Sequence, residues 1–115
     1  MQPSKVRKVF FFELAPGRFP AMDDLTDLKD LSVRRRLQHR IVRAGLGNYG
    51  VHRREGDFLE LIDHFGPGHR IYAGEVGAVL LLILVVGDKS TQAQDFAEAR
   101  AYWEHYKAQQ RQGGR

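Results

Sequence analysis

A run of nine apolar residues at positions 78–86, bounded by Gly77 and Gly87, constrains the fold of this chain more than any other feature. Its short length and the β-branched residues Val79, Ile83 and Val86 favour a strand over a helix. Because the run has no polar position, we expect this strand to be buried on both faces at the centre of a sheet. The run is less than half as long as a bilayer-spanning helix, so it predicts no membrane segment.

Turn-bounded apolar segments predict further strands around this one. They lie at residues 5–14, 51–55, 58–65 and from 69 onward, with tight turns at 66–68 and 74–77. The segment with Arg53 and Arg54 is polar, as edge strands tend to be. In the next segment Asp63 falls on the same face as Leu61 and Phe65, so it requires either a bulge or a buried partner.

Three segments have the apolar spacing of helices. Residues 20–31 predict a short helix, residues 33–44 predict a second helix capped by Ser32, and Thr91 with Gln94 forms a capping box for a third helix that ends near residue 109. Consecutive hairpins after residue 50 favour antiparallel pairing. The expected fold is a single α+β domain over residues 1–115, with an antiparallel twisted sheet of four or five strands. Two helices from the N-terminal half lie on one face, and a C-terminal helix precedes a disordered tail at 110–115.

Positive charge is concentrated in residues 31–54, which hold seven arginines, two histidines and no acid, whereas residues 21–30 hold four aspartates. Such a block attracts polyanions, of which nucleic acid is the commonest, although a solvated helix face is an equally open alternative. The candidate nucleic-acid-binding residues are Arg35, Arg36, Arg40, Arg43, Arg53, Arg54 and His69.

The composition also excludes several kinds of chemistry. The chain has no cysteine, which excludes disulfides and thiol catalysis. Its five histidines show no metal-ligand spacing with carboxylates, and no glycine-rich nucleotide loop is present, so we expect neither a metal nor a small-molecule cofactor. The N-terminus does not follow the plan of a signal peptide, so a cytoplasmic protein is expected. Any catalysis would rest on acids, bases and charges alone.

Two blocks of sequence resemble the RelE/ParE superfamily of bacterial toxins from type II toxin-antitoxin modules, in particular its HigB-like branch, often labelled addiction module killer protein. The blocks are Gly66-Pro67-Gly68-His69-Arg70-Ile71-Tyr72 and Gly87-Asp88-Lys89-Ser90-Thr91-Gln92, and the resemblance runs over about residues 46–106. It implies the RelE/ParE-like fold and a ribosome-dependent mRNA endonuclease, or mRNA interferase, that a cognate antitoxin neutralises. The implied partners are the antitoxin, mRNA and ribosomal RNA.

Metal-free RNA cleavage needs a base for the 2′-hydroxyl, cations for the phosphoryl oxygens and an acid for the leaving oxygen. Arg70 is the candidate phosphate clamp, because a guanidinium matches phosphate bidentately and the family's recurrent arginine aligns with it. Lys89 aligns with the family's lysine, His64 can serve either proton role, and Tyr72 can stack a base or supply a hydroxyl. Each has a structural alternative, which is a hairpin ion pair for Arg70, a helix terminus for Lys89, and packing for the other two.

The chain departs from the family pattern beside this proposed site. Ile62 stands where the branch usually has arginine, Asp63 adds an anion, and His69 replaces a tyrosine. A lost cation and an added anion weaken phosphate binding. The alternative hypotheses are therefore a non-catalytic ParE-like gyrase inhibitor or a degenerate toxin that only binds its antitoxin. A nucleic-acid-binding regulator is a third hypothesis, without a helix-turn-helix pattern to support it.

Overall fold

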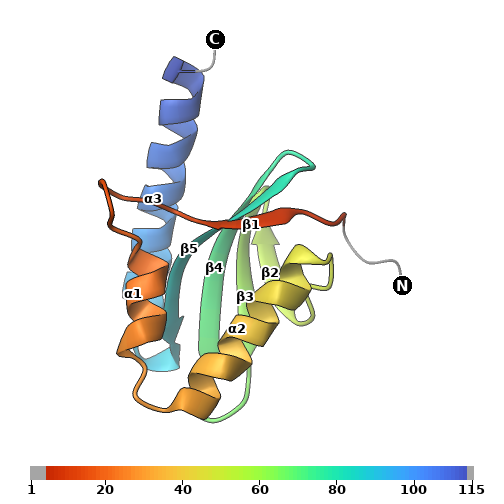
Figure 1. The fold of residues 1–115 in the computed structure, drawn as a ribbon, viewed down its shortest axis with the longest axis vertical. Coiled ribbons are helices and arrows are strands. Elements are labelled where there is room, and N and C mark those ends of the chain that lie inside the picture. The colour runs from red at the N-terminus through yellow and green to blue at the C-terminus, as the bar shows by residue number, and fades with distance from the viewer. Residues whose placement is uncertain (1–4, 114–115) are drawn as a thin grey trace.

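The computed structural model describes residues 5–113. The elements, in chain order, are β1 (Lys8–Phe11), α1 (Pro20–Asp27), α2 (Leu31–Gly45), β2 (His52–Glu55), β3 (Phe58–Asp63), β4 (His69–Val76), β5 (Leu80–Asp88), a 3-10 turn η1 (Lys89–Thr91) and α3 (Gln92–Gly113) (Figure 1). The α+β class is confirmed. None of the helices within residues 5–113 is both long and apolar enough to cross a bilayer.

The five strands form one mixed sheet in the order β1-β5-β4-β3-β2. Each consecutive pair from β2 to β5 is antiparallel, but β1 is parallel to β5, with Lys8 opposite Leu80 and Phe11 opposite Ile83. The expectation of an antiparallel sheet is therefore wrong for β1. Hairpin connections dictate antiparallel pairing only between consecutive strands, whereas α1 and α2 separate β1 from the rest of the sheet. The prediction that the apolar run is an interior, buried strand is confirmed for residues 80–86 of β5, but Ala78 and Val79 lie in the preceding turn, where Val79 is 69% exposed.

Helices cover the sheet on both sides (Figure 1). Leu25 of α1 and Leu37 and Ile41 of α2 pack against one side of the sheet, which we call the α2 face. Ala99 and Trp103 of α3 pack against the other side, which we call the α3 face. Burial of these side chains is the main favourable contribution to folding, at roughly 25 cal/mol per Å² of apolar surface.

Strand β4 runs to Val76, so residues 74–76 are strand where the sequence predicts a turn. The turn itself centres on Gly77, whose φ of 56° is left-handed. Gly74 lies inside the strand instead, because the ring of Trp103 packs directly on it and a Cβ there would collide with the ring. The glycine therefore serves helix-to-sheet contact, which local turn chemistry does not reveal.

The helix termini differ from the sequence expectations. Asp30, rather than Ser32, caps α2, since its carboxylate accepts the backbone N–H of Ser32 at 2.9 Å. The hydroxyl of Thr91 donates to Asp95, so the expected capping box with Gln94 is replaced by a 3-10 turn. Helix α3 runs to Gly113, so residues 110–113 are helical rather than disordered. The segment has strong helix formers and no helix breaker before Gly113. Residues 114–115 lie outside the described part.

Helix α1 closes the edge of β5 beyond the end of β1. The last backbone bond between the β1 segment and β5 is from Phe12 to the carbonyl of Ile83, and the N–H of Val86 donates instead to Asp24 at 2.9 Å. Burial raises the pKa of Asp24 to about 6; the bond from Val86 opposes the shift, and neighbouring acids including Asp95 add to it. The carboxylate thus caps a strand edge while its ionised form is disfavoured in the fold.

Asp24→Asn is expected to stabilise the protein at pH 8 and to change little at pH 4. Because the folded pKa lies above the unfolded value, the stability that Asp24 contributes is full below about pH 4 and is lost as the pH rises through 6. The asparagine oxygen still accepts the N–H of Val86 but carries no charge. At pH 8 the substitution should therefore raise the free energy of unfolding by about 1 kcal/mol, after allowance for solvent screening. Urea unfolding at both pH values measures this, with the exposed Asp27→Asn as control. Equal effects of the two substitutions at pH 8 would contradict the assignment.

Candidate active site and nucleic-acid interface

A nearly buried ion pair lies on the α3 face of β3 and β4. The Nε of Arg70 donates to Oε2 of Glu60 at 2.9 Å, and the two side chains are only 9% and 4% exposed. The Nη1 group of Arg70 also reaches the carbonyl of Gly68 at 3.4 Å. Arg70 therefore forms an ion pair, which is the structural role that was the alternative to phosphate binding. Its partner, Glu60, is not among the predicted site residues.

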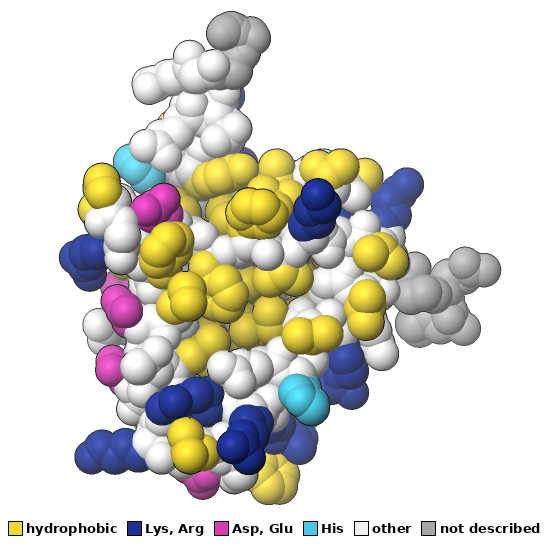
Figure 2. Space-filling model, viewed as in Figure 1, with side chains coloured by type: hydrophobic (Ala, Val, Ile, Leu, Met, Phe, Trp, Pro, Cys, Tyr) yellow, Lys and Arg dark blue, Asp and Glu magenta, His cyan; other side chains and the backbone are white. Residues whose placement is uncertain are grey.

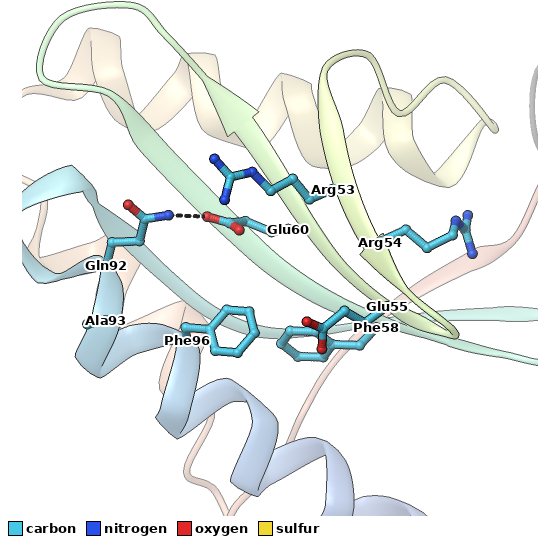
Figure 3. Close-up of a pocket in the computed structure, with 8 residues that line it drawn as sticks. All are labelled: Arg53, Arg54, Glu55, Phe58, Glu60, Gln92, Ala93 and Phe96. Atoms are coloured by element: carbon cyan, nitrogen blue, oxygen red, sulfur yellow. Dashed lines mark hydrogen bonds between the residues drawn. The ribbon is translucent and has the colours of Figure 1, made fainter.

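Gln92 and Tyr72 complete this cluster. The amide of Gln92, the first residue of α3, donates to the same Oε2 of Glu60 at 2.9 Å (Figure 3). Tyr72 pairs with Glu60 in the β3–β4 register, and its hydroxyl donates to the carbonyl of Gln92 at 3.4 Å. Burial, and then the negative charge of Glu60, raise the pKa of Tyr72, so its hydroxyl stays protonated at neutral pH. We call these four residues, Glu60, Arg70, Tyr72 and Gln92, the Glu60 cluster.

Two members of the Glu60 cluster, Glu60 and Gln92, line a cavity of roughly 420 Å³. Its lining includes Arg53, Phe58, Glu60, Gln92, Ala93 and Phe96. Figure 3 shows the guanidinium of Arg53 reaching over Glu60 from β2, and the ring of Phe96 on the opposite side of the opening. Arg53 faces Glu60 across the β2–β3 pair, is exposed, and has no ion pair or side-chain hydrogen bond within residues 5–113. Both bonds to Glu60 end on Oε2, which leaves Oε1 for a ligand.

Lys89 lies close to Arg70 at the end of β5. A Cβ placed on Gly68 would be 3.7 Å from Nη1 of Arg70 and 3.8 Å from Cβ of Lys89, so both side chains border the same point. Lys89 is exposed at the first position of η1, which Asp88 caps by accepting the N–H of Ser90. The hydrogen bonds from Ser90 lower the pKa of Asp88. The structure thus brings together Arg70, Tyr72 and Lys89 of the predicted catalytic set.

His64 and His69 lie apart from this cluster. His64 is exposed after the end of β3 and lines a groove of roughly 1190 Å³ that we call the α2 groove. His69 is 6% exposed and pairs with Asp63 in the register of β3 and β4, on the α2 face. Neither histidine is positioned to exchange a proton with a ligand bound at Glu60.

The α2 groove gathers much of the positive charge. It runs between α2 and the end of β3, and its basic lining is Arg35, Arg36, His39, Arg40, Arg43 and His64. Figure 2 shows Lys and Arg side chains clustered at the lower end of this side of the molecule, with apolar side chains in its middle. The groove and the Glu60 cluster lie on opposite faces of the sheet.

Of the two alternatives for Asp63 on the apolar face, a bulge or a partner, the structure has the partner, since the β3–β4 register is regular at Asp63. Arg36 binds it bidentately at 2.7 and 3.1 Å, and the guanidinium of Arg36 also lies 4.3 Å from the centre of the exposed Phe65 ring. Burial opposes ionisation of Asp63, but the bonds from Arg36 and from the N–H of Phe65 outweigh it and lower the pKa. Arg36 is therefore partly neutralised, which leaves Arg35 and Arg43 as the more available cations of the groove.

Arg40 is turned into the fold. Its side chain is 6% exposed and donates to the carbonyls of Tyr49, Val51 at 2.8 Å and Ile62 at 3.2 Å. Burial lowers its pKa, and the charge of Arg43 adds to that effect. Although sequence reasoning placed Arg40 among the nucleic-acid-binding residues, its hydrogen-bonding capacity is directed at the connection between α2 and β2.

Arg54 is likewise engaged in a network on the α2 face. It binds the buried Glu75 bidentately at 2.9 and 3.0 Å, Tyr49 donates its hydroxyl to Glu75 at 2.6 Å, and Arg7 lies 3.5 Å from it. Burial opposes ionisation of Glu75, but hydrogen bonds from Arg54 and Tyr49 outweigh it and lower the pKa of Glu75. Burial, together with the bond to Glu75, raises the pKa of Tyr49 to about 12. We call Arg7, Tyr49, Arg54 and Glu75 the Glu75 network.

Sequence reasoning missed Glu60 and Gln92. A signal for Glu60 existed, because it alternates onto the face opposite Leu61 and is the one acid of β3 on that side. Gln92 lies at the end of the second family-like block, but its contact with Glu60 depends on how α3 leaves the sheet. Within residues 5–113, no three His, Asp or Glu side chains converge as metal ligands would.

Comparison with curated proteins found an uncharacterized protein of Haemophilus influenzae strain Rd. It is 36% identical over 77 residues, which cover 66% of this chain and 78% of that protein. No family model matches the chain, and no solved structure matches it.

Proposed function

The chain belongs to the same family as the uncharacterized Haemophilus influenzae protein, and we propose that it is a metal-free endoribonuclease acting in the cytoplasm as the toxin of a type II toxin-antitoxin module. One observation carries the proposal, which is the nearly buried Glu60–Arg70 pair at the side of an open cavity with Lys89 close by. A pocket with a few convergent polar groups is the default candidate for a binding or catalytic site. The sequence blocks that resemble RelE/ParE toxins contain Arg70, Lys89 and Gln92, and they add the mRNA, the ribosome and the antitoxin as partners.

The cluster supplies the parts that RNA cleavage requires. Oε1 of Glu60 takes the proton of a 2′-hydroxyl, whose oxygen attacks the adjacent phosphorus and forms a 2′,3′-cyclic phosphate. Arg70 stabilises the negative charge that develops on the phosphoryl oxygens, and Lys89 protonates the departing 5′-oxygen. Gln92 and Tyr72 hold Glu60 and the start of α3 in place. Acid–base catalysis of this kind contributes about 10²- to 10⁴-fold to a rate.

The α2 groove fits a second stretch of RNA. Arg35 and Arg43 are exposed there, and they attract phosphates from the face opposite the Glu60 cluster. One short single strand cannot occupy both faces of a sheet that is covered by helices on each side. This separation favours a protein that holds ribosomal RNA with one face while the message reaches the other.

Induced expression in bacteria tests the proposal. The wild type is expected to arrest growth and to produce new mRNA ends, whereas Glu60→Gln and Arg70→Lys are expected to lower cleavage at least about 10²-fold. Glutamine keeps the shape of Glu60 without its basicity, and lysine keeps the charge of Arg70 without its fork. Glu55→Gln, on the rim of the same cavity, is the matched control and should cleave like the wild type. Undiminished cleavage by folded Glu60→Gln protein would refute Glu60 as the base.

A non-catalytic binder is the second candidate, and a specific observation favours it. Arg70 is already held by Glu60, and its partner across the β3–β4 pair is Ile62, so that position supplies no additional cation. Such a protein would act like a ParE-type gyrase inhibitor, or would bind only its antitoxin. Inhibition of gyrase supercoiling by purified protein, without new mRNA ends, would favour this candidate over the nuclease.

A further inference from the structure

The cavity beside Glu60 has an aromatic wall. Phe96 stands edge-to-face on Phe58, with ring centres 5.4 Å apart, and on Tyr72 at 6.2 Å, so its plane is fixed by two neighbours. Phe96 is only half-buried, and Figure 3 shows its ring beside the cavity opening. A fixed, partly exposed aromatic ring is a platform on which a flat ring of a ligand can stack.

The polar groups of the cavity point to one kind of ligand. Arg53 reaches over the opening without a protein partner within residues 5–113. Its guanidinium suits a ligand with phosphate groups or with a row of acceptor atoms, while the aromatic wall suits a planar ring. A volume of roughly 420 Å³ lies in the usual range for small-molecule sites.

We propose that this cavity is a nucleobase subsite that prefers guanine, with the base stacked on Phe96 and Arg53 donating to its O6 and N7 atoms. A guanidinium carries only donors, and guanine is the base that presents two adjacent acceptors to it. Adenine places an amino group where guanine has O6, so it loses one of the two bonds, and a pyrimidine offers less stacking area. The inference deepens the proposed nuclease function, because it assigns the residue that selects the base next to the cleaved phosphate.

Binding of mononucleotides to the intact chain tests the subsite without any need for cleavage. Guanosine, adenosine and cytidine 5′-monophosphates are titrated, and amide chemical shifts of the protein are followed by NMR. The guanine nucleotide is expected to bind about 5- to 10-fold more tightly than the adenine nucleotide, as one base-specific contact of about 1 kcal/mol or more predicts. The shifts should centre on residues around Phe96 and Arg53.

Two substitutions separate the contributions of stacking and of base selection. Phe96→Leu keeps apolar packing but removes the platform, so all three nucleotides should bind several-fold more weakly. Arg53→Gln should remove the preference for guanine over adenine, while Glu55→Gln, on the same rim, should leave it unchanged. Thermal unfolding of each variant verifies that the fold is retained. Because Arg53 is exposed, its substitution should leave the fold intact.

The outcomes for the subsite and for the nuclease can be told apart. Guanine-selective binding that depends on Arg53, without RNA cleavage by the wild type, would support the subsite and overturn the nuclease. RNA cleavage that is indifferent to the neighbouring base and unaffected by Arg53→Gln would overturn the subsite and leave the nuclease intact. Absence of nucleotide binding at millimolar concentration, or equal binding of all three nucleotides, would also overturn the subsite.

Discussion

Glu75→Ala is expected to lower the free energy of unfolding at pH 7 by about 3–5 kcal/mol, because it breaks a buried, multiply hydrogen-bonded charge pair. Arg54 and Arg7 would lose their shared anion, and the buried hydroxyl of Tyr49 would lose its acceptor at 2.6 Å. Urea unfolding followed by circular dichroism measures the loss. Because the interactions hold the pKa of Glu75 below its ordinary value of 4.5, its contribution is present above that pH and is lost as the pH falls. The difference between variant and wild type should therefore shrink as the pH falls below 4.5 and through the lowered pKa of Glu75.

The control for this prediction is Glu55→Ala. Glu55 is an exposed acid whose surface ion pair with Arg100 spans 3.5 Å, and such pairs contribute about 0–1 kcal/mol. Glu75→Gln should fall between the two variants, since it keeps an acceptor for Tyr49 but no charge for the arginines. A Glu75→Ala protein as stable as Glu55→Ala would show that the Glu75 network does not hold the N-terminal segment and β4 together.

Arg40→Met is expected to lower the free energy of unfolding by about 2–4 kcal/mol, through the loss of donors to three backbone carbonyls. Methionine fills much of the volume of the side chain but cannot satisfy these oxygens. A large loss of stability, measured by urea unfolding, would identify Arg40 as part of the fold rather than of an RNA-binding surface.

The comparison for Arg40 is its exposed neighbour Arg35. Arg35→Gln should change stability by less than about 0.5 kcal/mol, yet it should reduce the slope of log affinity for ribosomes against log salt by about one. If Arg40→Met instead kept full stability and reduced the salt slope in the same way, the two arginines would be equivalent and the assignment of Arg40 would be wrong.

The local sequence pattern predicts the structure correctly where few arrangements can accommodate a given type of side chain. The apolar run had to become an interior strand, and β5 is one. Asp63 on an apolar face needed either a bulge or a partner, and Arg36 supplies the partner at 2.7 Å. In both cases the cost of the alternative, an exposed apolar strand or an unpaired buried charge, exceeds anything the local backbone could offer.

Other features depended on contacts between distant segments. The seven arginines of residues 31–54 look alike in sequence, but the register of β2 sends Arg53 to the α3 face and Arg54 to the α2 face, and the turn of α2 buries Arg40. Glu60 acquires its significance only when β4 brings Arg70 beside it. Nothing near Gly74 in sequence predicts that Trp103 packs on it, so the local pattern indicates a turn at this position.

The parallel pairing of β1 with β5 has a consequence for the order of folding. Lys8 and Leu80 are neighbours in the sheet but are separated by most of the chain, so during synthesis β1 has no strand to pair with until β5 has left the ribosome. Contacts of such long sequence separation form slowly, because the intervening chain must first be ordered. Until then Phe11 and Phe12 are without their native cover, while Phe10 is 55% exposed even in the folded protein, so this is the interval of greatest risk of aggregation for the nascent chain.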